Sequence, residues 1–431
     1  MELARQASQN TKLQIDEVKP ILIGKYKHAA YKPCYWTAQS LRTGGRRQCY
    51  KHNFGIESHQ CIQSTSFRGC NIACSFCWRD VEGRQHAFEK LDEPAEIADE
   101  LVLTQKRVIE ESLPSALENF ELMTKIVRIL SSGESSLRAL ADGCKSSIQK
   151  VDDALVDLKV ANVVQKKGAK IFALGEGLSA STLSEEESVE LVERLVATRK
   201  DIVRVHIESS NPKHVAISYD GEPTMYSKIG ELISEFRKKG ISTFLVTNGT
   251  FPERIIEMKN SGNLPTQLYV TMAAPDKETY LKVCSSVTPY FPVHNDHWER
   301  LGRTLGMLSS LECRTVIRIT SVRGVNMIQP EIYRKKIKES NPSFLELKGF
   351  SITGNAPMIS RRLGKSLSED RDELFRKAFQ YCPTHEEILR FAREISSDFG
   401  EFPLVSESKV NRQALMRVGW QGPVAIDFDE L

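Results

Sequence analysis

The sequence predicts an α/β protein: a partial TIM-like barrel of six βα units with an inserted winged-helix-like α+β segment. From residue 186 onward, helical patterns alternate with short apolar runs of strand length, as in a parallel sheet with crossover helices. A further strand is expected just before a cysteine-rich loop at residues 68–78. Polar residues follow several of these strands, and barrels of this type carry their chemistry at those strand ends.

The barrel elements follow one another in βα order. The predicted strands are short apolar runs at residues 64–67, 213–218, 242–247, 267–272, 314–322 and 344–348. The predicted helices have apolar residues at helical spacing and cover residues 93–112, 186–197, 229–239, 255–260, 298–308, 330–339 and 385–395. We expect all six strands to be parallel.

Residues 115–178 interrupt this alternation. Helices are predicted at residues 120–130, 134–143 and 147–159, and a hairpin is predicted at residues 162–174. Three helices followed by a β-wing is the winged-helix order, in which one helix can enter a nucleic-acid groove. A helical spacer or a protein-docking module is an alternative interpretation of the same pattern.

Four parts of the chain are therefore expected. Residues 1–62 form a basic N-terminal segment, and residues 63–114 and 179–410 form the barrel. Residues 115–178 form the inserted segment, and residues 411–431 form a C-terminal tail.

The composition is that of an ordinary globular protein, because 40% of the 431 residues are hydrophobic and 27% are charged. The net charge is only +3, but residues 1–60 hold ten Lys and Arg against four Asp and Glu. Such a basic segment favours an anionic partner such as nucleic acid, and a solvated arm without a partner is the alternative. No apolar run has the length of a signal peptide or a membrane span, so a cytoplasmic monomer without membrane contact is expected.

The most informative stretch is the loop with Cys70, Cys74 and Cys77 in C-x3-C-x2-C spacing. Three thiolates on one loop can hold three irons of a [4Fe–4S] cluster, which normally takes four cysteines. The fourth iron is then open to the amino and carboxylate groups of S-adenosylmethionine, which an electron from the cluster can cleave to a radical. A zinc site is the alternative, although zinc ligands usually come as C-x2-C pairs or with a histidine pair.

A second set of three cysteines, Cys34, Cys49 and Cys61, precedes this loop. They can hold a second cluster that is again one ligand short, or they can simply be buried. Lys51 lies two residues after Cys49 and can form a Schiff base with a carbonyl substrate, although a solvated lysine is the plainer interpretation.

Two strand ends carry candidate ligands for S-adenosylmethionine. Gly221 and Glu222 follow the predicted strand at residues 213–218, and Thr247 and Asn248 follow the next one. Each is a weak signal alone, because Asn-Gly is usually just a turn. Their occurrence at successive strand ends supports a shared site.

These motifs resemble a known family. The cysteine loop and Gly-Glu-Pro turn are similar to those of the radical S-adenosylmethionine superfamily. More narrowly, the chain resembles the archaeal-type tRNA 4-demethylwyosine synthases over residues 30–112 and 186–410, in the stretches SFRGCNIACSFCWRD, AISYDGEPTMY, FLVTNGT, QLYVTMAAPD, RTVIRITSVRGVNM and FLELKGF.

The resemblance implies a lyase that converts N1-methylguanosine at position 37 of tRNA(Phe) into 4-demethylwyosine with two carbons from pyruvate. It implies two [4Fe–4S] clusters, a radical cluster on Cys70, Cys74 and Cys77 and a second on the upstream trio. It also implies S-adenosylmethionine, Lys51 as the Schiff-base lysine, the anticodon stem-loop as partner and an external electron donor. The alternatives are another radical enzyme, for a different RNA modification or glycyl-radical activation, and a zinc-containing winged-helix regulator.

Overall fold

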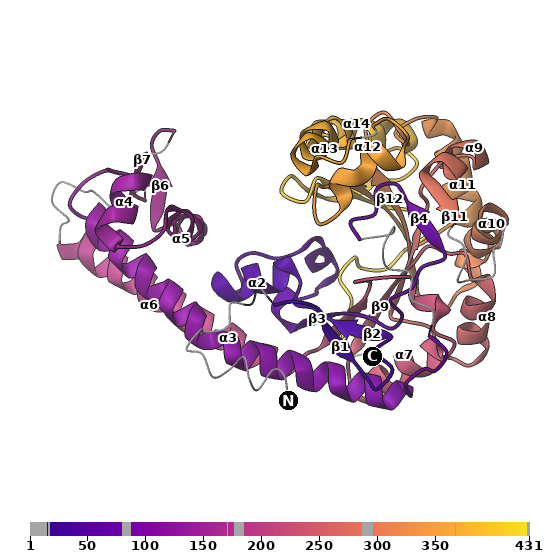
Figure 1. The fold of residues 1–431 in the computed structure, drawn as a ribbon, viewed down its shortest axis with the longest axis horizontal. Helices are drawn as coiled ribbons and strands as arrows, with labels where there is room; N and C mark the ends of the chain where they lie inside the picture. The colour runs from indigo at the N-terminus through magenta and orange to yellow at the C-terminus, as the bar shows by residue number, and fades with distance from the viewer. Residues whose placement is uncertain are drawn as a thin grey trace.

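The computed structural model describes residues 15, 18–79, 88–169, 171–175, 185–286, 296–366 and 368–428. A large lobe holds the main sheet, and a smaller lobe is carried at the end of two long helices, α3 and α6, that lie side by side (Figure 1). Each lobe has its own cluster of buried apolar residues.

The main sheet has ten strands in the order β1-β2-β3-β8-β9-β10-β12-β13-β15-β14. Its six central strands are parallel, which confirms the prediction. They are β3 (Cys61–Thr65), β8 (His214–Ile217), β9 (Ser242–Thr247), β10 (Gln267–Thr271), β12 (Arg314–Ser321) and β13 (Phe344–Gly349). Four antiparallel edge strands were not predicted: β1 (Ile21–Ile23), β2 (Ala29–Tyr31), β15 (Gln413–Arg417) and β14 (Leu404–Ser408).

The first barrel strand lies earlier than predicted. β3 begins at Cys61, which pairs with His214 of β8, and it ends at Thr65. The prediction of a strand over residues 64–67 is therefore wrong at both ends. The chain leaves the sheet at Ser66, whose carbonyl accepts a 2.7 Å hydrogen bond from Nδ1 of His28.

The two helices that carry the smaller lobe are longer than predicted. The helices expected at residues 93–112 and 120–130 are one helix, α3 (Pro94–Leu130), which continues through Pro114. Few residues in its middle are buried, because its first half packs on the core of the large lobe and its last turns pack on that of the smaller lobe. This gap in the apolar pattern made one helix resemble two. The partner helix α6 (Glu185–Ser209) likewise extends well beyond residue 197.

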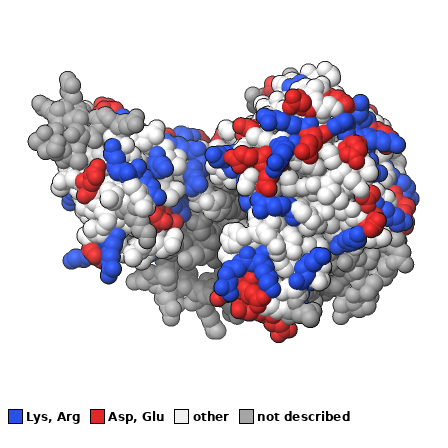
Figure 2. Space-filling view, turned by 90° about the horizontal axis from the view of Figure 1, so that it is seen from above, with Lys and Arg blue, Asp and Glu red and all other residues white. Residues whose placement is uncertain are grey.

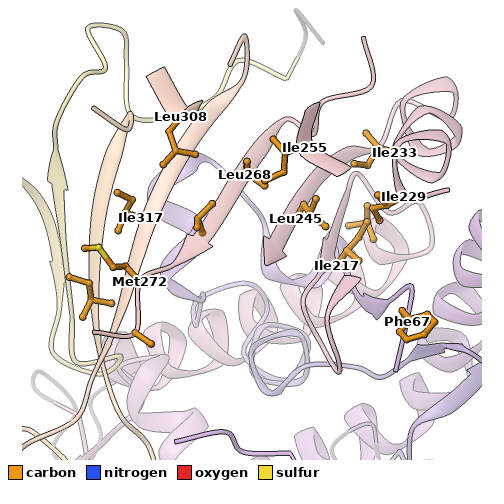
Figure 3. Packing of buried hydrophobic residues seen from close by; sticks show 14 of the residues in the cluster. Phe67, Ile217, Ile229, Ile233, Leu245, Ile255, Leu268, Met272, Leu308 and Ile317 are labelled. Atoms are coloured by element: carbon orange, nitrogen blue, oxygen red, sulfur yellow. The ribbon is translucent and has the colours of Figure 1, made fainter. Parts of the chain in front are cut away.

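The helices that cover the sheet agree with the prediction. They are α7 (Ile229–Lys238), α8 (Pro252–Asn260), α10 (His297–Met307), α11 (Pro330–Ser340) and α14 (His385–Ile395). Figure 3 shows strand residues such as Leu245 and Leu268 beside Ile233 and Ile255 of the covering helices. Each such side chain stabilises the fold by about 2 kcal/mol when it leaves water.

The smaller lobe has the three helices and the β-wing that the sequence predicts, and it also has a short strand between the first two helices that was not predicted. After α3 come β5 (Ser135–Ser136), α4 (Leu137–Cys144), α5 (Ile148–Val160), β6 (Val164–Lys166) and β7 (Ile171–Leu174). The three strands form one sheet in the order β5-β7-β6. The serines Ser136 and Ser147 cap α4 and α5, each accepting a hydrogen bond from a backbone N–H.

Shorter elements surround the open end of the barrel. They are α2 (Tyr35–Arg42), β4 (Ile72–Cys74), α9 (Lys277–Val283), β11 (Cys284–Ser286), α12 (Ile359–Arg362) and α13 (Arg371–Ala378). In the part of the chain that the structure describes, no helix has the length and apolar character needed to cross a bilayer.

Candidate active site

A cavity of about 730 Å³ lies where the parallel strands end. The structure brings all eleven residues singled out from the sequence to its wall: Cys34, Cys49, Lys51, Cys61, Cys70, Cys74, Cys77, Gly221, Glu222, Thr247 and Asn248. The two cysteine trios, which the sequence presents as separate groups, therefore share one chamber. Their chemical roles remain predictions, and the local geometry of each decides what it can do.

The cysteine loop is held in a fixed shape. The backbone N–H of Cys77 donates to the carbonyl of Cys74 at 2.9 Å, and the Arg362 guanidinium donates to the carbonyl of Cys77. Burial raises the pKa of Cys70 well above its usual value and raises that of Cys77 to about 11. Such buried thiols ionise only beside a strongly positive group. Three soft sulfur donors in this setting fit an iron–sulfur cluster.

A fourth cysteine, Cys284, lies beside the loop and was missed by the sequence analysis. β11 pairs with β4 so that Cys284 is the register partner of Cys74, and their Sγ atoms are 3.4 Å apart. The hydrogen bond between the two thiols, in which a protonated Cys74 can be the donor, and burial together raise the pKa of Cys74. Nothing in the sequence near Cys284 resembles a ligand motif, so only the strand pairing reveals this contact.

The upstream cysteines sit at two helix starts. Cys34 caps α2, and its sulfur accepts a 3.2 Å hydrogen bond from the N–H of Thr37. Cys49 caps the short 3-10 helix Tyr50–Phe54 and accepts from the N–H of Lys51 at 3.3 Å. Burial and the nearby Cys49 raise the pKa of Cys34, and the hydrogen bonds from Thr37 at the helix start oppose the rise. This donor set also fits a metal cluster, with Cys61, whose pKa burial raises to about 12, as the third thiol.

Among the described residues, no three His, Cys, Asp or Glu side chains come together closely enough to hold one metal ion, and this applies equally to both cysteine trios.

Lys51 is only 5% exposed and lies on the aromatic floor of the cavity. Its Nζ is 5.6 Å from the ring centre of Phe244 and 6.0 Å from that of Tyr269. Within the described part of the chain its amine has no hydrogen bond or ion pair. A second lysine, Lys348, lines the same cavity, with its Nζ 4.2 Å from the ring centre of Tyr50.

Glu222 joins two strand ends. Its carboxylate is 2% exposed and accepts hydrogen bonds from Thr247 Oγ1 at 2.6 Å and from the N–H of Asn248 at 2.7 Å. Burial raises the pKa of Glu222, and these donors oppose the rise. Asn248 in turn donates to Asn71 Oδ1 at 2.9 Å, which ties this network to the cysteine loop. Asn71 was missed by the sequence analysis because a lone asparagine inside the cysteine motif carries no signal.

Gly221 permits a close approach of two backbones. Its φ is +70°, and a Cβ at this position would lie 2.1 Å from the carbonyl oxygen of Phe67 and 2.5 Å from that of Gly69. The N–H of Glu222 donates to the Gly69 carbonyl at 2.8 Å. Only glycine lets the turn after β8 lie against the cysteine loop in this way.

Arg318 adds a fixed cation to the cavity wall. Its Nε pairs with Glu346 at 2.8 Å and its Nη2 donates to Tyr50 OH at 2.7 Å. Burial alone lowers the pKa of Arg318, but the charges of Glu346, Tyr50 and Tyr269 outweigh it and raise the pKa. The cavity wall therefore carries both sulfur donors and cations.

Comparison with known proteins agrees with this geometry. Residues 177–337 match the model of the radical SAM superfamily. The chain is 30% identical over 394 residues to the S-adenosyl-L-methionine-dependent tRNA 4-demethylwyosine synthase of Pyrococcus horikoshii, covering 90% of this chain and 84% of that protein. It is 29% identical to the mouse enzyme of the same name over 90% of this chain, which spans 38% of the mouse protein.

Solved structures share the fold. An archaeal TYW1 structure superposes with a TM-score of 0.54 at 21% identity, over 99% of this chain and 97% of that one. A TYW1 structure described as carrying a bound lysine–pyruvate adduct gives 0.58 at 23% identity, over 94% and 95% of the two chains. The partial-barrel fold, the radical SAM match and the similarity across nine-tenths of the sequence lead to one conclusion. The chain belongs to the family of S-adenosyl-L-methionine-dependent tRNA 4-demethylwyosine synthases.

Proposed function

We propose that this chain converts N1-methylguanosine at position 37 of tRNA(Phe) into 4-demethylwyosine, with pyruvate as carbon donor. The observation that carries the proposal is the single cavity in which Lys51 and both cysteine trios meet. A relative of the same fold is described as holding a lysine–pyruvate adduct, and Lys51, two residues after Cys49, is a buried lysine on the cavity wall of this chain.

The cysteine loop is proposed to hold a [4Fe–4S] cluster through Cys70, Cys74 and Cys77. A second cluster is proposed on Cys34, Cys49 and Cys61. Held by its three cysteines next to S-adenosylmethionine, the first cluster would supply one-electron radical chemistry, with the electron taken from a separate donor. The network of Glu222, Thr247 and Asn248 is proposed to fix the strand ends against which S-adenosylmethionine binds.

Lys51 is proposed to hold pyruvate. Its amine attacks the ketone carbon, a C–N bond forms, and loss of water leaves a protonated imine. The aromatic rings of Phe244 and Tyr269 shield the amine from water. In the described part of the chain, no carboxylate pairs with this amine. Arg318 and Lys348 are the cations of the same cavity that can pair with the pyruvate carboxylate.

The remaining partners are part of the same proposal. The RNA is the anticodon stem-loop, whose target base must leave its stack to reach the cavity. We propose that the electron comes from a separate donor and that the chain acts as a cytoplasmic monomer.

Adduct trapping tests the proposal. The reconstituted protein is mixed anaerobically with pyruvate and borohydride, and the modified peptide is identified by mass spectrometry. We expect a reduced adduct on Lys51, its loss in Lys51→Ala and its retention in Lys335→Ala, which removes an exposed lysine that does not line the cavity. The same three proteins are assayed for 4-demethylwyosine in tRNA(Phe) by nucleoside analysis.

The outcomes separate the possible failures. Full adduct and product with Lys51→Ala would remove the Schiff-base role from Lys51. A wild-type protein that cleaves S-adenosylmethionine but yields no 4-demethylwyosine would instead be another radical enzyme, acting on a different substrate.

A further inference from the structure

A second cavity of about 510 Å³ lies between the N-terminal segment and helix α5 of the smaller lobe, and we call it the interlobe cleft. Its walls come from both lobes: Lys32, Pro33, Cys34, Tyr35, Gln39, Arg42, Arg47, Asp153 and Val156. In Figure 1, α5 lies on the side of the smaller lobe that is turned toward α2. The reaction proposed above gives the cleft no role.

The interlobe cleft adjoins the reaction cavity. Lys32, Pro33, Cys34 and Tyr35 line both spaces, so the two lie on either side of this one segment. Tyr35 is 58% exposed at the junction, and its ring is 5.1 Å from that of Trp36 in an edge-on contact. A planar group that moves from the cleft toward the cavity therefore passes two aromatic rings.

The charge of the cleft is mainly positive. Lys32 and Arg47 have no carboxylate partner among the described residues, and Arg47 is aimed by a hydrogen bond to the amide oxygen of Gln39. Arg42 is a third cation, and Asp153 is the acid of the lining. Viewed from above, Lys and Arg side chains gather where the smaller lobe meets the large one (Figure 2).

A buried ion pair fixes the smaller lobe as one wall of the cleft. Asp157 of α5 has no exposed side-chain surface, and its Oδ2 accepts from Arg42 Nε at 3.1 Å and Nη2 at 2.9 Å. Asn119 of α3 donates to the same oxygen at 3.2 Å. Burial raises the pKa of Asp157, and Arg42 opposes the rise. The helix that occupies the recognition position of a winged helix is thereby turned toward the enzyme body.

We propose that the interlobe cleft binds the sugar–phosphate backbone of the tRNA whose base enters the reaction cavity. Lys32 and Arg47 pair with phosphates, and Tyr35 and Trp36 stack on a base next to the reacting one. The inserted lobe supplies the opposite wall, so it belongs to the substrate-binding surface. This inference rests on the proposed function and deepens it.

An RNA fits these features better than a protein does. Cations without carboxylate partners, aromatic rings beside them and an adjoining cavity for a base are the features of single-stranded RNA sites. An acidic electron-donor protein would match the charge but would not need the stacking rings. That partner is kept as an outcome of the test.

Salt-dependent binding tests the inference. Fluorescently labelled tRNA(Phe) transcript is titrated with the full-length protein at several salt concentrations, followed by anisotropy. A Lys32→Glu/Arg47→Glu variant should bind at least about tenfold more weakly, and its plot of log affinity against log salt should be shallower by about 1.4 for two lost phosphate contacts. Lys259→Glu/Lys335→Glu, with the same charge change on exposed helices α8 and α11, is the matched control and should keep the wild-type slope.

An Asp157→Asn variant tests the role of the inserted lobe, because it weakens the anchor and leaves Lys32 and Arg47 in place. We expect weaker tRNA binding with an unchanged melting temperature of the large lobe. If this variant fails to fold, the Lys32→Glu/Arg47→Glu variant still tests whether the cleft binds RNA, because Lys32 and Arg47 lie outside both apolar cores.

Several outcomes would overturn the inference. Wild-type affinity and slope in Lys32→Glu/Arg47→Glu would exclude the cleft as the RNA site, while product formation by the wild type would leave the proposed function intact. Normal tRNA affinity with slower cluster reduction by a flavodoxin-type donor would assign the cleft to that protein instead. Tight, cleft-dependent tRNA binding without any 4-demethylwyosine would support the cleft and refute the proposed function.

Discussion

The sulfur atoms of Cys74 and Cys284 lie 3.4 Å apart, although 210 positions separate them in the sequence. They are register partners across the β4–β11 pair, so the backbone itself holds them together. A thiol at this distance can donate a hydrogen bond to the thiolate that we propose as a cluster ligand.

Replacing Cys284 should change the reduction potential of the cluster. Hydrogen bonds to cluster sulfurs are among the factors that set this potential. We expect a more negative potential in Cys284→Ala and a value close to wild type in Cys284→Ser, whose hydroxyl can still donate. Redox titration followed by electron paramagnetic resonance measures the shift, and Cys144→Ala in the smaller lobe is the control. Equal potentials in all four proteins would show that Cys284 only fills space.

Iron analysis tests the two cysteine trios. After anaerobic reconstitution we expect about eight irons per wild-type chain and about four in a Cys34/Cys49/Cys61→Ala variant, because each trio would hold one [4Fe–4S] cluster. Cys144/Cys313/Cys382→Ala removes the same number of thiols elsewhere and should keep about eight. About four irons in both the wild type and the first variant would mean that the upstream cysteines are not ligands.

Gly221→Ala should displace the cysteine loop. The added Cβ would lie 2.1 Å from the Phe67 carbonyl oxygen. We expect a loss of at least about 2 kcal/mol in the free energy of unfolding and a lower iron content. Gly240→Ala is the matched control, since its φ is +68° but no atom lies within 4 Å of the new Cβ. It should cost about 1 kcal/mol and leave iron binding unchanged. Similar losses in both variants would show that backbone strain alone is responsible.

The fold should lose stability as the pH falls below about 6.5, the ordinary pKa of histidine in an unfolded chain. His28 is fully buried; its Nδ1 donates to the Ser66 carbonyl at 2.7 Å, and its Nε2 accepts from the N–H of Asp92 at 2.7 Å. Both nitrogens are therefore used by the neutral ring. Burial lowers the pKa of His28, partly offset by Ser66 and Asp92.

Below pH 6.5, His28 binds a proton in the unfolded chain but stays neutral in the folded chain. The stability that His28 contributes above pH 6.5 is therefore lost as the pH falls from 6.5 toward the lowered pKa of the folded state. Melting temperatures between pH 7.5 and pH 5 measure the effect. His28→Gln should be less stable at pH 7.5 but should lose less on acidification. Parallel curves for the two proteins would exclude His28 as a source of the pH dependence.

The elements with a clear local sequence pattern could be predicted from the sequence. The six parallel strands and their helices carry strong periodicity, and the two cysteine trios have informative spacing. The unbroken course of α3 was missed because its middle turns touch neither core, so no apolar face marks them. The roles of Cys284 and Asn71 could not be predicted from the sequence, because each residue contacts a site residue that is distant in sequence. The short edge strands β1 and β2 are three residues each, too short for a period-two pattern.

The paired helices α3 and α6 also have a consequence for how the chain folds. The neighbouring strands β3 and β8 are separated in sequence by residues 66–213, and a flexible loop of that length would cost roughly 4 kcal/mol of closure entropy. The smaller lobe has its own core, so it can form early and bring the two helices together. When α3 and α6 pair, strands β3 and β8 come to lie at the same end of the helix pair. The smaller lobe would thus speed the pairing of β3 with β8, and its removal should slow refolding more than it lowers stability.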